Sequence, residues 1–82
     1  MIDFRKVGRK ILYFRRRKNL SQDDIAERMF VSRQLVSKWE NGTGIPKIDH
    51  ILDLCEILDV TFEELLCLND KKEGRGKWFL KE

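Results

Sequence analysis

One stretch near the middle of the chain predicts a short helix with a defined beginning and end: Val31-Ser32-Arg33-Gln34-Leu35-Val36-Ser37-Lys38-Trp39-Glu40-Asn41-Gly42. Ser32 suits the N-cap, because its hydroxyl can accept a hydrogen bond from an otherwise unpaired amide of the first turn. Gly42 suits the end, because glycine readily takes the left-handed conformation that closes a helix. We therefore expect a helix over residues 33–41.

The two sides of this helix differ in chemistry. At about 100° per residue, an arc of about 140° collects the polar side chains, namely Arg33, Gln34, Ser37, Lys38 and Asn41. The opposite side carries Leu35, Val36 and Trp39, with Glu40 at the boundary. Arginine, glutamine, lysine and serine are residue types that hydrogen-bond to base edges in the major groove. The polar arc is therefore either an ordinary solvated surface or a DNA-reading surface, and the flanking sequence decides between the two.

A second short helix is expected directly before this one, over residues 22–29. Ser21 can cap it, and Asp24 stands three residues later, where it completes a short-armed capping box. Ala26 is small enough to let another helix approach closely. Only Phe30 and Val31 separate the two helices. Helices joined by so tight a turn cannot lie antiparallel, so we expect them to cross at a steep angle.

Apolar periodicity predicts three further helices. Residues 3–18 carry an apolar stripe, interrupted by Gly8 at a position where another helix can approach closely. Pro46 can occupy the start of a fourth helix that runs to about residue 58. Its apolar stripe consists of Ile48, Ile51, Leu52, Leu54, Cys55 and Leu58. Thr61 and Glu64 form a capping box that opens a short fifth helix. The sequence therefore predicts an all-α, compact five-helix fold.

Composition and charge limit the class of protein. A chain of 82 residues makes one small domain. It has no apolar run long enough to cross a membrane and no secretory signal peptide, so we expect a cytoplasmic protein without membrane contact. The net charge is +7 over residues 1–20, −7 over residues 49–70 and +3 over residues 71–82. The basic part suits a polyanionic partner, although the two ends can also neutralise each other across the fold.

Metal binding and catalysis find no support in the sequence. Cys55 and Cys67 are 12 residues apart, and His50 is the only histidine, so the spacing of a zinc site is missing. Both cysteines are expected to be reduced thiols that act as small apolar residues. No nucleophile is paired with a base. We expect no metal, no cofactor and no enzymatic activity.

The chain resembles the lambda-repressor-like (Cro/repressor, XRE-type) helix-turn-helix regulators over about residues 4–66. The matching residues are Ile11-x-x-Phe14-Arg15, Leu20-Ser21-Gln22, Ile25-Ala26, Val31-Ser32-Arg33-Gln34, Val36-Ser37-x-Trp39-Glu40-Asn41-Gly42, Pro46 and Val60-Thr61-x-x-Glu64-Leu65-Leu66. The resemblance implies a transcriptional regulator, most often a repressor, that binds a near-palindromic double-stranded DNA operator as a homodimer.

The resemblance also implies a role for each position of the helix pair. The side chains that would read bases in the major groove are Arg33, Gln34, Ser37 and Lys38. The side chains that would contact phosphate are Gln22, Asn41 and Thr43. Apart from the resemblance, the basic run at the end of the first helix predicts a phosphate contact for Arg16. For Arg16 a favourable interaction with the helix dipole is the structural alternative.

Two further positions matter for the structure of the helix pair. Arg15 and Glu40 match a partly buried ion pair that ties the first helix to the recognition helix. Phe30 stands in the turn where the family commonly has glycine. This departure predicts either a slightly different turn or an aromatic side chain that covers the helix pair.

The chain divides into residues 1–68, expected to be the DNA-binding domain, and a basic and apolar tail over residues 69–82. The tail contains Trp78-Phe79-Leu80, which can fold back on the core, form a dimer contact or pair as a short strand. The alternative to a DNA-binding regulator is a protein-interaction module that uses the same fold and binds a partner protein through residues 49–82.

Overall fold

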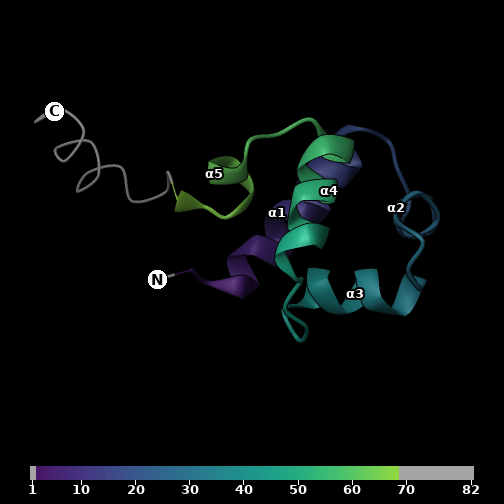
Figure 1. Ribbon diagram of the computed structural model, residues 1–82, viewed down its shortest axis with the longest axis horizontal. Helices are drawn as coiled ribbons and strands as arrows, with labels where there is room; N and C mark the ends of the chain where they lie inside the picture. Colours follow the sequence, from purple (N-terminus) through teal and green to yellow (C-terminus); the bar gives the residue numbers. More distant parts are fainter. Residues whose placement is uncertain (1, 69–82) are drawn as a thin grey trace, which may run out of the picture.

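The structure, a computed structural model, describes residues 2–68, and all of its regular elements in that range are helical (Figure 1). The helices are α1 (Phe4–Arg17), α2 (Gln22–Met29), α3 (Arg33–Asn41), α4 (Ile48–Leu58) and α5 (Phe62–Leu65). Helix α3 lies along one edge of the molecule, and α2 is seen nearly end-on in a view in which α3 runs across the page (Figure 1). The predicted all-α, five-helix fold and the steep crossing of α2 and α3 are confirmed.

The predicted helix caps form as hydrogen-bonded pairs. The Ser21 hydroxyl accepts a bond from the Asp24 N–H at 2.9 Å, and the Asp24 carboxylate accepts one from the Ser21 N–H at 2.8 Å. These bonds from Ser21 hold the pKa of the Asp24 carboxyl below its usual value. The Ser32 hydroxyl caps α3 through the Leu35 N–H, and Thr61 caps α5 in a second capping box. Local sequence therefore sets where these three helices begin.

Buried apolar side chains from every helix form the core. The largest fully buried side chain is that of Trp39, on the inner side of α3. The other members are Val7, Ile11, Ile25, Ala26, Met29, Val36, Ile51, Leu54, Leu58, Leu65 and Leu66. Because α3 contributes only Val36 and Trp39 to this cluster, most of its remaining surface faces outward.

Helix α1 approaches the end of α3 unusually closely at Gly8. A Cβ atom placed on Gly8 would collide with the Trp39 carbonyl oxygen and would lie 2.7 Å from that of Glu40. Both obstacles are backbone atoms, which cannot move aside as a flexible side chain can. The close approach of another helix that Gly8 predicts is therefore confirmed, and the partner helix is α3.

Helix α4 differs from the prediction in its start and in its outer face. It begins at Ile48 with Lys47 as the N-cap, so Pro46, which is buried, lies before the helix rather than at its first position. Ile48 and Leu52, predicted as part of the apolar stripe, are 57% and 55% exposed. The other helices cover only the side of α4 that carries Ile51, Leu54 and Leu58.

The turn between α2 and α3 keeps a glycine-like conformation although Phe30 occupies it. Phe30 has φ 58° and ψ 44°, in the left-handed region, and its N–H donates to the carbonyls of Ala26 and Glu27. Its side chain is 94% exposed. The prediction that the Phe30 ring covers the helix pair is therefore wrong, because the ring covers nothing in the described chain. Helices commonly end in this left-handed conformation, and glycine adopts it at the lowest cost.

Candidate nucleic-acid interface

The outer face of α3 presents the predicted base-reading side chains together. Arg33, Gln34 and Lys38 are exposed, and Ser37 is half-buried between them. The N-cap at Ser32 fixes the start of the helix and Trp39 anchors its inner side, so these four side chains project from a rigid element. Such a polar, protruding helix at the edge of a domain has the dimensions to enter the major groove of DNA.

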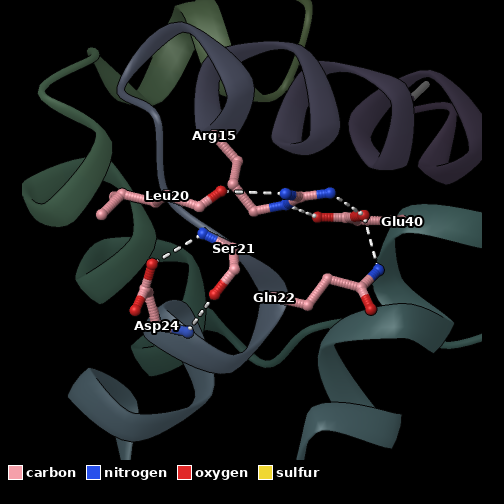
Figure 2. Close-up of polar contacts among 6 residues, drawn as sticks. All are labelled: Arg15, Leu20, Ser21, Gln22, Asp24 and Glu40. Carbon is pink, nitrogen blue, oxygen red and sulfur yellow. Dashed lines mark hydrogen bonds and ion pairs between the residues drawn. The ribbon is translucent and has the colours of Figure 1, made fainter.

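A partly buried ion pair holds α3 against α1 (Figure 2). Arg15 Nε donates to Glu40 Oε2 at 2.6 Å, and Arg15 Nη2 donates to Glu40 Oε1 at 3.1 Å. The side chains are only 11% and 5% exposed. Arg15 Nη1 also donates to the Leu20 carbonyl at 2.9 Å, which ties the end of the α1–α2 connection to α1. Two parallel bonds between planar groups fix orientation as well as distance.

Gln22 joins this ion pair from the first residue of α2. Its Nε2 donates to Glu40 Oε1 at 2.8 Å, so Glu40 accepts bonds from both α1 and α2 (Figure 2). The side chain is half-buried, at the end of α2 that carries the unpaired helix amides. The second hydrogen of its amide group is still available to an acceptor. The sequence predicts a phosphate contact for Gln22 and gives no signal for its bond to Glu40.

Residues at the other end of α3 form its closing turn. Gly42 takes the left-handed conformation with φ 78°, as its position predicts. The N–H groups of Thr43 and Gly44 both donate to the Lys38 carbonyl, at 3.0 and 3.1 Å. The Thr43 hydroxyl makes a longer bond of 3.4 Å to the same carbonyl. The side chains of Asn41 and Thr43 are exposed, so the turn presents them beside α3.

Arg33 has an acidic neighbour that sequence reasoning missed. Its Nε lies 3.4 Å from Asp23 Oδ1, in a contact between the first turns of α3 and α2. Both side chains are well exposed, so the pair contributes little to stability. The sequence does not reveal this pair, because the helix dipole alone explains an acidic residue such as Asp23 in the first turn of α2. Contact between Arg33 and a base would require the guanidinium to leave Asp23.

Arg16 lies apart from the other predicted contacts. It is exposed and lines a shallow hollow along α1 together with Arg9, Tyr13 and Arg17. No residue of α3 lines this hollow. Arg15, one position earlier, turns instead toward Glu40. The structure therefore places Asn41 on α3 and Gln22 and Thr43 beside it, whereas Arg16 lines a hollow formed by α1 alone.

The remaining chemistry-bearing residues form no metal site in the described part of the chain. No group of three or more His, Cys, Asp or Glu side chains there is placed to hold a metal ion. The His50 ring packs at 5.1 Å from the Trp39 ring. Burial and the charges of Glu63 and Glu64 raise the pKa of the Cys55 thiol, and Cys67 is buried. Residues 2–68 also contain no helix both long and apolar enough to cross a membrane.

Comparison with known proteins places this geometry among helix-turn-helix proteins. The helix-turn-helix family HTH_3 matches residues 11–65. The HTH-type transcriptional activator BcrR of Enterococcus faecalis is 40% identical over 61 residues, which are 74% of this chain and 30% of that protein. The uncharacterised HTH-type transcriptional regulator y4dJ of Sinorhizobium fredii is 32% identical over 71 residues, which are 85% of this chain and 92% of that protein.

Two solved structures share the fold. The restriction-modification controller protein C.AhdI from Aeromonas hydrophila has a TM-score of 0.71 and 32% identity, over 77% of this chain and 91% of that one. The DNA-binding domain of BldD has a TM-score of 0.68 over 78% of this chain and 93% of that one, and at 21% identity this likeness concerns the fold alone.

Proposed function

The chain belongs to the HTH_3 helix-turn-helix family of DNA-binding transcriptional regulators, which are not enzymes, and we propose that α3 reads a specific operator in the major groove. The observation that carries this proposal is the outward projection of Arg33, Gln34, Ser37 and Lys38 from one rigid helix. Arg33 and Lys38 suit guanine, and Gln34 suits adenine. These contacts supply specificity, while phosphate contacts supply most of the affinity.

The phosphate contacts are proposed to flank α3 at both ends. Gln22 would use the amide hydrogen that Glu40 leaves available, so the ion pair would also orient a DNA contact. Asn41 and Thr43 would hold the backbone at the far end of the helix. Arg16 would reach phosphate only from the side of α1 that carries Tyr13 and Arg17, which makes it the weakest member of the set.

Binding is proposed to involve two copies of the chain. A homodimer would place two α3 helices on a near-palindromic operator with half-sites about 10 bp apart. Residues 1–68 would form the DNA-binding domain, and the tail of residues 69–82 would contribute to the dimer contact. A regulator that binds DNA in this way would act in the cytoplasm.

Repression is the proposed regulatory outcome. Occupying an operator can block transcription without any further contact surface, whereas activation needs one. BcrR is an activator, and the chain spans only about 30% of its length. A reporter gene that is expressed more strongly when the protein is present would overturn the assignment as a repressor without affecting the DNA-binding proposal.

The test of base reading is the substitution Gln34→Ala. It is expected to weaken binding to the preferred duplex by about 1–3 kcal/mol and to relax the preference at one base pair. The control is Tyr13→Phe, which removes one exposed hydroxyl and keeps the ring beside Arg16 and Arg17, so both affinities should stay unaltered. Titrations on the preferred and on a scrambled duplex decide the matter, because equal losses on both would remove Gln34 from base reading.

A protein-interaction module is the second candidate, favoured by the apolar and acidic outer face of α4. In that case a partner protein would bind through residues 49–82. The two candidates differ in their response to salt, since DNA binding weakens steeply as salt is added. Failure to bind any duplex at low salt would favour the protein-interaction module.

A further inference from the structure

Helix α4 carries an apolar strip on the side that faces away from the core. Ile48 and Leu52 are 57% and 55% exposed and lie four residues apart, so they are neighbours on the helix surface. Cys55, half-buried, extends the strip by one turn. Ile45, in the loop before α4, is 67% exposed. Exposed apolar side chains that gather on one helix face, unlike scattered ones, indicate a contact surface.

Acidic side chains lie next to this strip. Asp49, Asp53 and Glu56 are exposed and follow one edge of it along α4. Glu63 and Glu64 of α5 add negative charge near Cys55, because after burial their charges also raise the pKa of its thiol. Residues 48–68 contain no lysine or arginine. The outer face of α4 is therefore apolar at its centre and negative around it.

The tail of the chain has the complementary pattern in its sequence. Trp78, Phe79 and Leu80 are bulky and apolar, and Lys77 and Lys81 stand directly on either side of them. Three more cations precede this segment, namely Lys71, Lys72 and Arg75. An apolar centre with positive flanks matches a surface that has an apolar centre and negative flanks.

We propose that residues 77–81 of one copy bind the outer face of α4 in a second copy of the chain. This inference rests on the proposed homodimer and names the contact that would hold it together. Each copy offers one tail and one face, so a twofold exchange closes at two copies and leaves neither surface unused.

The length of the tail and the area of the contact both suit this exchange. At about 3.3–3.6 Å per residue, the ten residues from Leu68 to Trp78 reach up to about 35 Å, roughly twice the 16 Å length of an eleven-residue helix. A buried aromatic side chain contributes about 150–250 Å², so two reciprocal contacts would bury on the order of 1,500 Å², the size of a standard stable interface.

The first test compares two substitutions that each remove an exposed apolar side chain. Leu52→Asn is expected to raise the dimer dissociation constant about tenfold or more, as loss of a central apolar anchor does. The matched control Phe30→Asn removes a still more exposed side chain from the α2–α3 turn and should leave the constant unchanged. Trp78→Ala should reproduce the effect of Leu52→Asn. Sedimentation equilibrium of the full chain measures all four proteins, and circular dichroism checks that each is folded.

The outcomes separate this inference from the proposed function. A dimer that persists in both Leu52→Asn and Trp78→Ala would overturn the tail contact and leave the proposed dimer standing. A wild-type chain that sediments as a monomer, both alone and on its preferred duplex, would overturn both. Equal weakening by Leu52→Asn and Phe30→Asn would also overturn the tail contact, because the loss would then not be specific to α4.

A thiol cross-link distinguishes exchange between copies from folding back on the same copy. In the full-length variant Lys81→Cys, mild oxidation is expected to join the new thiol to Cys55 and to give a covalent dimer on a non-reducing gel. Adding Cys55→Ala should abolish that dimer. A disulfide within one chain, seen as oxidised protein of monomer mass, would overturn the exchange, and so would a cross-link that persists in the Cys55→Ala variant.

Discussion

Glu40 connects three helices by hydrogen bonds. It lies on α3, and its carboxylate accepts hydrogen bonds from Arg15 of α1 and from Gln22 of α2. Its side chain is almost fully buried. A buried carboxylate of this kind is stable only while its partners are present, because a charge without a partner loses its hydration and gains nothing in return. The orientation of α3 therefore depends on one ion pair as well as on the apolar core.

Removing one member of the pair should destabilise the protein strongly. Arg15→Ala is expected to lower the free energy of unfolding by about 3 kcal/mol, because it leaves the buried Glu40 carboxylate without its main partner. Arg9→Ala, an exposed change on the same helix, is the control and should have little effect. Urea denaturation measures both. A loss for Arg15→Ala no larger than that for Arg9→Ala would mean that the pair does not hold α3 in place.

Phe30, in contrast to Glu40, is expected to destabilise the structure in which it lies, because its backbone is in the left-handed region. A non-glycine residue in the left-handed region is disfavoured by about 1–2 kcal/mol, and the exposed ring of Phe30 gains no burial to offset this. Phe30→Gly is therefore expected to raise the free energy of unfolding by about 1 kcal/mol, despite the greater chain entropy of glycine. Thermal and urea unfolding test this, and a lower stability would show that the Phe30 ring packs on the protein.

At the scale of the elements, the contact between α1 and α3 depends on the absence of a side chain at position 8. Glycine within a helix is normally about 1 kcal/mol less favourable than alanine. At position 8 glycine should instead be more favourable than alanine, because a Cβ at Gly8 would meet the backbone carbonyls of Trp39 and Glu40. Gly8→Ala is expected to destabilise the protein by about 1–3 kcal/mol, the usual range for overpacking.

The same helix supplies the control for this substitution. Arg9→Ala replaces an exposed side chain of α1 and should change stability only slightly. Differential scanning calorimetry of the two variants reports the difference. If the Gly8→Ala variant were as stable as the wild type, α1 and α3 could not lie as close together at Gly8 as the structure shows.

The elements also show which features sequence can predict. The caps at Ser21, Ser32 and Thr61 could be predicted, because each depends on residues within three positions along the chain. The exposure of Ile48 and Leu52 could not, because periodicity identifies an apolar side but not how much of it the other helices cover. The bond from Gln22 to Glu40 could not be predicted either, because it joins positions 18 residues apart and leaves no pattern in the local sequence.

At the scale of the whole molecule, charge and function are distributed over different faces. The basic residues of the N-terminal part lie mainly on α1, and the polar face proposed to read DNA lies on α3. The acidic residues of α4 lie beside an apolar strip. A chain with this arrangement can approach DNA with one face and a second copy with another. The two proposals are therefore compatible, because the α3 side chains that would read DNA are not those of the α4 strip.

In-vitro selection from random duplexes tests the central claim, that the outer face of α3 reads an operator as part of a dimer. At low salt the wild-type chain is expected to enrich a near-palindrome with half-sites about 10 bp apart. The same selection with Gln34→Ala should lose its preference at one base pair in each half-site. Enrichment of no common sequence, or of the same sequence with unchanged preferences in the variant, would contradict the account.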